Sequence, residues 1–322
     1  MMSNSCHIVA NLPSSSPAAL SASAIAAGGT GRRFGRRIEV YDCVTSTNDL
    51  GLRLLAGRTP LESAVVPISL FGGSDQALDG RILLAESQTQ GRGRLGRTWT
   101  MPRGGGLLMS VLIDSPVGVH SRSPAQRAGI WTAWAAVSVA ECLAEWVDRS
   151  HVVSIKWPND VRIDRLKVAG ILVERPAIDT GGFVVGIGIN LQLDRDSFLA
   201  EVRSQAGSLN WFVAPESLPL DRNRFAGRLI EIMNDYGFDL ETREEIPGRF
   251  ARLVERFQSR LEGFDAPVIL TTPRERLQGR LVGLEPGGLA RLETAAGPIL
   301  TRPTAWIERI TPEGHDQDQM DV

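Results

Sequence analysis

Cysteine, histidine and long apolar runs are scarce in this chain of 322 residues. The three cysteines, Cys6, Cys43 and Cys142, stand far apart, so the sequence indicates neither a disulfide framework nor a zinc cluster. The four histidines are equally isolated and show no metal-ligand spacing. No apolar run reaches the roughly 18 residues that a membrane-spanning helix needs, so we expect no membrane partner.

Three common catalytic signatures are also missing. The sequence contains no phosphate-binding G-x-x-x-x-G-K-[ST] loop and no G-x-S-x-G nucleophile elbow. Gly186 and Gly188 are followed by Leu191, so the dinucleotide fingerprint G-x-G-x-x-G is not completed, and the pattern opens no helix. These absences exclude the commonest nucleotide-binding and serine-hydrolase designs.

Composition is that of an ordinary globular protein, with 43% hydrophobic and 22% charged residues. The length suggests one large domain and a smaller one. A formal net charge of −2 argues against a general nucleic-acid-binding protein. Any cationic site must therefore be local.

The N-terminal segment contains no Asp or Glu up to residue 38, and it ends in four arginines. A secretory signal would place its positive residues before the apolar region, and here they follow it. We expect residues 1–36 to be a disordered leader of a cytoplasmic protein; an over-extended start and an organellar transit peptide are the alternatives. The polar residues 313–322 are expected to form a disordered tail.

A short Gly/Arg loop, Gly91–Arg97 with the sequence GRGRLGR, is the most informative stretch. It lies between two apolar runs, 81–85 and 107–113, which are typical of strands buried on both faces. Glycine allows backbone N–H groups to approach a ligand closely, and arginine offers a permanently charged fork for carboxylate or phosphate. A solvated surface turn and an RG-rich nucleic-acid-binding segment are the alternatives.

The chain before residue 150 predicts a strand, two helices and a loop insertion. A strand at 37–41 precedes a helix whose start is crowded with hydroxyl and amide side chains at 45–49, more than one N-cap needs. Residues 57–80 are typical of a loop insertion. Ser123-Pro124 predicts the start of a long helix to about Asp148, with its tryptophans in the core.

The second half predicts strands at 152–157, 166–174 and 183–190, helices at 221–237 and 245–261, and a group of short strands beyond residue 263 at 267–270, 277–282, 290–293 and 305–307. The closely spaced final strands suggest a small barrel. Two lysines lie within apolar strand patterns. We expect Lys156 to reach solvent or a local carboxylate and Lys167, which precedes Val-Ala-Gly, to meet an anion.

If the Gly/Arg loop and Lys167 converge, the site holds many cations and no obvious nucleophile or histidine base. Such a site suits the joining of two anions, for example a carboxylate and the α-phosphate of ATP. Two unit charges about 4 Å apart repel by roughly 4 kcal/mol at an effective dielectric near 20, and fixed cations remove that repulsion. An acyl adenylate requires no enzyme nucleophile.

Five motifs in this order resemble those of the biotin–protein ligases, over about residues 37–210. They are Ser46-Thr-Asn48, Glu86-Ser-Gln-Thr-Gln-Gly-Arg-Gly-Arg-Leu-Gly-Arg-Thr-Trp99, Lys156-Trp-Pro-Asn-Asp160, Lys167-Val-Ala-Gly-Ile-Leu-Val-Glu174 and Gly186-Ile-Gly-Ile-Asn190. The resemblance implies an α/β (α+β) fold related to class II aminoacyl-tRNA synthetases, a mixed sheet with flanking helices at 37–261, and an SH3-like β-barrel at 262–312. It implies the formation of biotinyl-5′-AMP from biotin and ATP with Mg²⁺, then transfer of biotin to a lysine of a biotin carboxyl-carrier protein, usually that of acetyl-CoA carboxylase.

The resemblance also implies roles for individual residues. The residues implied to bind biotin are Ser46, Thr47, Asn48, Gln88, Arg92, Gly93, Arg94 and Lys167. Those implied on the ATP side are Arg94, Arg97, Trp99, Asn159, Lys167 and Asn190. The catalytic set is Lys167, Arg92, Arg94 and Asp160, where Asp160 either orients the carrier lysine or helps to hold magnesium; the full set of magnesium ligands stays open.

Two departures from the family pattern and two rival functions remain. The insertion at 57–80 is longer than expected, and the acid-free leader stands in place of a helix-turn-helix domain, so DNA binding is not implied; a homodimer is one option. A lipoate–protein ligase is the nearest enzyme rival, although its Arg-Arg-x-Gly-Gly-Gly and His-x-x-Gly-Asn signals are missing. An RG-loop RNA-binding module is the non-enzyme rival, with Trp99 the one aromatic residue near the arginines.

Overall fold

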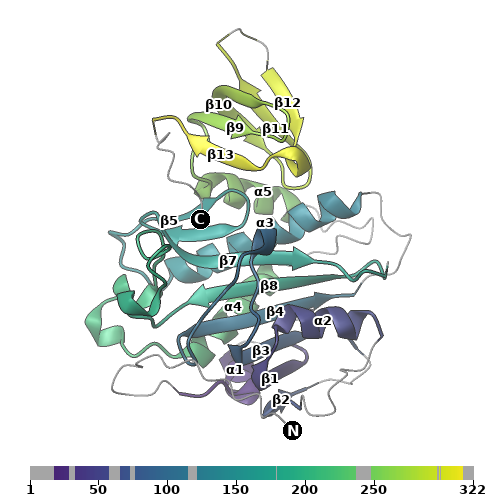
Figure 1. Ribbon diagram of the computed structural model, residues 1–322, viewed down its shortest axis with the longest axis vertical. Coiled ribbons are helices and arrows are strands. Elements are labelled where there is room, and N and C mark those ends of the chain that lie inside the picture. The colour runs from purple at the N-terminus through teal and green to yellow at the C-terminus, as the bar shows by residue number, and fades with distance from the viewer. Residues whose placement is uncertain are drawn as a thin grey trace.

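The structure is a computed structural model that describes residues 18–28, 33–57, 66–72, 77–114, 122–178, 180–236, 248–295, 297 and 299–314. An eight-stranded mixed sheet forms the centre, and a five-stranded antiparallel sheet lies at one end of the molecule (Figure 1). Within the described residues, no helix is both long and apolar enough to cross a bilayer.

The large sheet has the strand order β2-β1-β3-β4-β8-β7-β6-β5. Its strands are β1 (Ile38–Val44), β2 (Ser69–Phe71), β3 (Ile82–Gln88), β4 (Gly106–Ile113), β5 (Val153–Lys156), β6 (Asp160–Ile163), β7 (Leu166–Glu174) and β8 (Phe183–Asn190). β1 and β3 are parallel, and the other neighbours are antiparallel. β3 and β4 are buried almost throughout, which confirms the expectation of two buried strands flanking the Gly/Arg loop.

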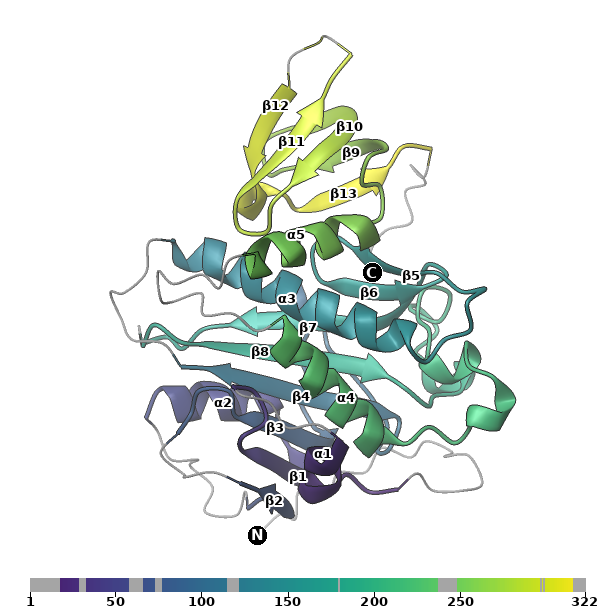
Figure 2. The ribbon, with the colours of Figure 1, turned by 180° about the vertical axis from the view of Figure 1, so that it is seen from behind.

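Helices cover both faces of this sheet. α2 (Thr47–Leu55) lies on the face seen in Figure 1, against β4 and β8. α1 (Ala22–Gly28), α3 (Pro124–Ala144) and α4 (Arg222–Asp235) lie on the opposite face, seen in Figure 2. The predicted start of α3 is confirmed, since Ser123 and Gln126 form a reciprocal capping box. Trp131 and Trp134 are fully buried, so their interpretation as core residues is also confirmed.

The expectation that residues 1–36 form a disordered leader is wrong for the part that the structure describes. Leu20, Ile25 and Phe34 are buried, and α1 packs against α4. The Leu20 N–H donates to Glu86 Oε1 at 2.6 Å, and Arg222, which pairs with Glu86 at 2.9 Å, donates to the Ala18 carbonyl. A seven-residue helix is not stable alone, so these tertiary contacts account for its order. Residues 1–17 and 29–32 lie outside the described residues.

The predicted loop insertion at 57–80 also needs a correction. It contains the short strand β2, which pairs antiparallel with β1 at the edge of the sheet, and Phe71 packs against the core. Alternation of apolar residues over so few positions is a weak strand signal, which explains the error. Residues 58–65 and 73–76 lie outside the described part of the chain.

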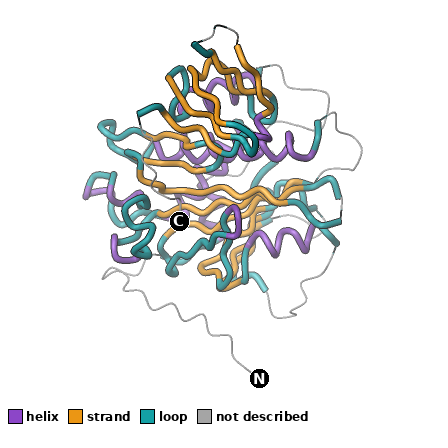
Figure 3. The backbone as a smooth tube through the Cα atoms, turned by 45° about the horizontal axis from the view of Figure 1, so that its top comes forward, coloured by secondary structure: helices purple, strands orange, loops and turns teal. Residues whose placement is uncertain are grey.

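The small sheet confirms the expected change to short strands beyond residue 263. It has the order β12-β11-β10-β9-β13, formed by β9 (Pro267–Thr271), β10 (Arg276–Leu284), β11 (Leu289–Glu293), β12 (Ile299–Pro303) and β13 (Arg309–Pro312). The strand predicted at 305–307 is wrong, because a 3-10 turn at Thr304–Trp306 occupies that place. The strands of the two sheets form separate groups (Figure 3).

The junction between the two units is packed. α5 (Arg249–Arg260) lies between α3 and the small sheet and buries Leu253 and Phe257 (Figure 2). The Trp157 indole N–H donates to the Ile307 carbonyl at 3.1 Å, and its ring meets Phe257 edge-on. The small sheet is thereby fixed beside the Lys156-Trp-Pro-Asn-Asp160 motif.

Candidate active site

One large cleft of about 1220 Å³ runs along the face of the sheet that α2 covers and reaches the small sheet. The start of α2, the Gly/Arg loop, β6, β7 and β8 all contribute to its walls. Every residue that the sequence nominated lines it, namely Ser46, Thr47, Asn48, Gln88, Arg92, Gly93, Arg94, Arg97, Trp99, Asn159, Asp160, Lys167 and Asn190. The structure therefore brings the whole set together, while the ligand of each residue stays a prediction.

A buried polar cradle forms one end of the cleft at the start of α2. Gln88 Oε1 accepts hydrogen bonds from the Thr47 backbone N–H at 2.7 Å and from the Thr47 hydroxyl at 3.1 Å. The fully buried Ser110 hydroxyl lies 2.8 Å from Thr47 Oγ1 and 2.7 Å from Asn48 Oδ1. Ser46 makes no side-chain cap hydrogen bond, so its hydroxyl is not used to cap the helix. The crowded polar start of α2 is thus a hydrogen-bonded wall of the cleft.

Ser110 was not nominated from the sequence, although it is central to this cradle. It interrupts the apolar run of β4, and a lone serine in such a run is more often a tolerated core residue. Its only sequence signal is therefore weak. The register explains its role, because Ser110 pairs with Gly186 on β8, where a side chain would strike Asn48 at 2.4 Å.

The Gly/Arg loop is a short hairpin over the cleft. Arg92 and Thr98 form an antiparallel bridge, and the Gly93 N–H donates to the Arg97 carbonyl at 2.7 Å. A 3-10 turn at Arg94–Gly96 makes the tip, where Leu95 has a positive φ of 58° and a side chain that is 87% exposed. At the base, a Cβ on Gly91 would lie 2.2 Å from the Trp99 carbonyl, so only glycine allows this closure.

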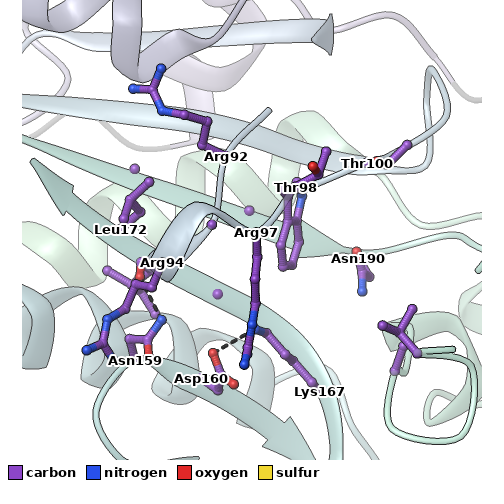
Figure 4. Close-up of a pocket in the computed structure, with 18 of the residues that line it drawn as sticks. Arg92, Arg94, Arg97, Thr98, Thr100, Asn159, Asp160, Lys167, Leu172 and Asn190 are labelled. Carbon is purple, nitrogen blue, oxygen red and sulfur yellow. Dashed lines mark hydrogen bonds and ion pairs between the residues drawn. The ribbon is translucent and has the colours of Figure 1, made fainter. Parts of the chain in front are cut away.

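The cations of the loop tip and of β7 face the same space. Lys167 Nζ lies 2.8 Å from Asp160 Oδ1 and 5.6 Å from the centre of the Trp99 ring. Arg94 Nη1 donates to Asn159 Oδ1 at 3.0 Å, and Figure 4 shows Arg94 and Arg97 reaching toward the Asn159–Asp160–Lys167 side. Lys167 thus pairs with a carboxylate of the chain itself, and the expectation that it meets an anionic ligand stays a prediction.

Partial desolvation in the cleft lowers the pKa of the Arg94 guanidinium. Its side chain is exposed, yet the surrounding walls displace part of its water, and this desolvation lowers the pKa of the guanidinium. Asp160 opposes the effect, and Arg97 adds to it. Arginine still stays charged at any physiological pH. The exposed guanidinium at the loop tip is therefore a permanently charged fork that can bind an anion.

Arg92 behaves differently from Arg94 and Arg97. Its guanidinium bonds to Asp49 and to both carboxylate oxygens of Glu174, at 3.0 and 3.1 Å. Burial alone would lower the pKa of Arg92, but the hydrogen bonds to these two carboxylates outweigh it and raise the pKa. In Figure 4 the Arg92 side chain points away from the Asp160–Lys167 pair.

Glycines of β7 and β8 make room for Trp99. A Cβ on Gly188 would lie 2.5 Å from the indole, and one on Gly170 would lie 3.1 Å from it. Gly186 and Gly188 both lie inside β8, which agrees with the rejection of a dinucleotide fingerprint. Asn190, at the end of β8, donates to the Gly207 carbonyl at 3.0 Å.

Two parts of the cleft were missed in the sequence. The segment 194–206 contributes Phe198, Leu199 and Val202, which make an apolar wall. The small sheet contributes Arg276 and Arg309. Neither part carries a compact motif, and both reach the cleft through tertiary packing.

Comparison with known proteins gives the family. The sequence pattern of the "Biotin/lipoate A/B protein ligase family" matches residues 70–194. The "Biotin--[acetyl-CoA-carboxylase] ligase" of Paracoccus denitrificans is 32% identical over 67% of this chain and 85% of its own length. The "Bifunctional ligase/repressor BirA" of Bacillus spizizenii is 28% identical over 70% of this chain, and the match spans 65% of the length of BirA.

The fold agrees with that of a solved relative. The biotin protein ligase of Aquifex aeolicus, determined in complex with biotin and ATP, superposes with a TM-score of 0.57 at 24% identity, over 85% of this chain and 98% of the other. The agreement in fold covers the mixed sheet with its flanking helices. The chain belongs to the biotin–protein ligase family.

Proposed function

We propose that this protein is an ATP-dependent biotin–protein ligase that activates biotin as biotinyl-5′-AMP and transfers it to a lysine of a carboxyl-carrier protein. The observation that carries the proposal is the convergence of the Gly/Arg loop and Lys167 on one cleft. Biotin and ATP both bring negative charge, and the cleft offers fixed cations from two different elements to meet it.

The residues of the cleft divide the first step between them. The cradle of Thr47, Asn48 and Gln88 would bind the polar ring of biotin, which directs its carboxylate toward Lys167. A carboxylate oxygen of biotin attacks the α-phosphorus of ATP, the new P–O bond forms, and the bond to the β-phosphate oxygen breaks to release pyrophosphate. Lys167 and Arg94 would offset the charge that gathers on the α-phosphate.

In the second step, the neutral amine of the carrier lysine attacks the biotinyl carbonyl carbon and AMP leaves, while the amine loses a proton. Asp160 is the carboxylate nearest to Lys167 and would orient that amine once Lys167 turns to the phosphate. Magnesium would enter bound to ATP. Carboxylate oxygens suit this ion, and Asp160, Asp194 and Asp196 line the cleft. Within the described ranges, no group of three metal-ligating side chains gathers.

A biotin-dependent ATP/pyrophosphate exchange assay tests the first step. We expect exchange that requires biotin and is lost in Lys167→Ala. Arg94→Gly should still form the adenylate but release it faster, because the loop tip loses its charged hydrogen-bonding group. An absence of biotin-dependent exchange in the wild-type protein would refute the proposal.

A lipoate–protein ligase is the second candidate, because the matching family includes lipoate ligases. The two acids differ in the ring that the cradle must hold: biotin has a polar ureido group, and lipoate has an apolar dithiolane. The hydrogen-bonded cradle around Thr47 favours the polar ring. Thermal shift with each acid separates the candidates, and stabilisation by lipoate alone would favour the second.

A further inference from the structure

The three arginines of the Gly/Arg loop do not have equivalent surroundings. Arg94 and Arg97 face Asp160 and Lys167 across the cleft (Figure 4). Arg92 is instead held by Asp49 of α2 and Glu174 at the end of β7. We propose that Arg92 anchors the base of the loop instead of binding the substrate anion, with Asp49 and Glu174 as the positioning residues that hold it. The proposal rests on the proposed function. It gives different roles to the arginines of the Gly/Arg loop: Arg92 anchors the loop, and Arg94 and Arg97 face the ligand.

The charges around Arg92 support this assignment. One guanidinium faces two carboxylates, so the group carries a net charge of −1 and does not attract an anion. Both Nη atoms already donate to these carboxylates. The three side chains are only 24–36% exposed, so water screens the pairs less than at an open surface.

The backbone gives the anchor its mechanical effect. Arg92 is a bridge residue at the base of the hairpin, opposite Thr98, and the Trp99 N–H donates to the Gly91 carbonyl at 2.9 Å. Fixing the Arg92 side chain therefore fixes the base of the loop relative to α2 and β7. The tip at Arg94–Gly96 has no such pair of carboxylates and keeps its arginine for the ligand.

The same carboxylates connect the anchor to the cradle. Asn48 Nδ2 donates to Glu174 Oε2 at 2.7 Å, while Asn48 Oδ1 accepts from Ser110, which also contacts Thr47. A ligand that orders the cradle thus orders the residues that hold Arg92. In this way the loop is made firmer by occupation of the cleft without a direct contact between Arg92 and the ligand.

The first test needs no activity. Hydrogen–deuterium exchange of the peptide covering 91–99 is measured in the ligand-free protein for wild type, Asp49→Asn and Glu174→Gln. We expect exchange in both variants to be about tenfold faster, because a charge-assisted hydrogen bond is lost, a change equivalent to about 1.4 kcal/mol. Glu141→Gln is the matched control, because Glu141 pairs with Arg260 at a similar exposure, 23%, away from the cleft. Unchanged exchange in 91–99 in both variants would overturn the anchor.

The second test uses the rate at which biotinyl-5′-AMP leaves the protein. Arg92→Ala, Asp49→Asn and the double variant are compared, because Asp49 bonds Arg92 whereas Glu174 also bonds Asn48 of the cradle. If Asp49 acts only by holding Arg92, the double variant releases the adenylate no more than about twofold faster than Arg92→Ala alone. Independent, multiplying effects would show that Arg92 touches the adenylate and would refute the proposal. If the wild-type protein forms no adenylate, the proposed function fails, and the exchange of 91–99 alone decides the anchor.

Discussion

Replacing Gly188 by alanine tests the geometry of the cleft most directly. A Cβ at this position would lie 2.5 Å from Cε2 and 2.7 Å from Nε1 of Trp99. Ordinary carbon–carbon contacts need about 3.5–4.0 Å, so the indole or the strand must shift by roughly 1 Å. The indole is rigid, and the Trp99 backbone is held by Gly91, so no flexible side-chain end can absorb the change.

Overpacking of this kind costs about 1–3 kcal/mol. Trp99 lies beside Lys167 on the side of the cleft assigned to ATP, so we expect the cost to fall on nucleotide binding as well as on folding. If the full cost fell on the nucleotide, the KM for ATP would rise about 5-fold to 140-fold, since about 1.4 kcal/mol corresponds to tenfold. Biotin affinity should change little, because the cradle residues Thr47, Gln88 and Ser110 lie on α2, β3 and β4 and not on the strand of Gly188.

The assay is ATP/pyrophosphate exchange at saturating biotin with ATP varied, together with calorimetric binding of biotin. Gly28→Ala is the control, because its Cβ meets nothing closer than 3.5 Å and it lies on α1. Adding Trp99→Phe to Gly188→Ala should recover part of the lost thermal stability, since the smaller ring leaves space. A Gly188→Ala protein with the wild-type KM for ATP and wild-type melting temperature would show that Trp99 does not lie on Gly188.

Three further outcomes are expected. Lys167→Ala should lower biotin-dependent exchange by at least about 100-fold with unchanged circular dichroism, because the transition state loses a fixed cation. Glu86→Gln should destabilise the fold by about 3–5 kcal/mol in urea titration, because it leaves the buried Arg222 charge unpaired; equal midpoints would contradict this. The hydrogen bond from the Val152 backbone N–H lowers the pKa of Asp164 in the folded protein. The ionised carboxylate therefore adds to the free energy of unfolding. This stabilisation is complete above the unfolded pKa near 3.9 and is lost as pH falls through the lower folded pKa. In Asp164→Asn this acid-dependent loss, a few tenths of a kcal/mol for an exposed group, should disappear from urea titrations between about pH 5 and pH 2.

The cleft could be predicted because its residues lie in compact motifs at the ends of buried strands. The Gly/Arg loop follows β3, and Lys167 lies at the start of β7, so the burial of the strands fixes where these side chains emerge. At these positions the motifs and the buried-strand patterns both place the side chains at the ends of strands. The sequence therefore sufficed to nominate the residues that line the cleft, although not to say what each one touches.

The parts that sequence reasoning missed depend on long-range packing. The N-terminal segment looked like a leader because it is rich in Ala and Ser, but Glu86 and Arg222, far along the chain, hold Leu20 and Ala18 by hydrogen bonds. The entry of the small sheet into the cleft depends on the hydrogen bond from Trp157 to Ile307. Neither partner can be identified from local composition, since each lies more than 60 residues away in sequence.

The two glycines of β8 do not complete a dinucleotide fingerprint, but they have a different role in the cleft. Gly186 and Gly188 are two residues apart in a strand, so they present the same face, and each leaves space for one side chain: Asn48 of the cradle and the indole of Trp99. Gly170 pairs with Gly188 across β7 and β8 and widens the space under the indole. A single strand thus sets the separation between the end of the cleft assigned to biotin and the end assigned to ATP. A larger residue at either glycine would change that separation but would leave every charged group of the cleft in place. Such a variant therefore tests how the two substrates are placed, separately from the charged groups that join them.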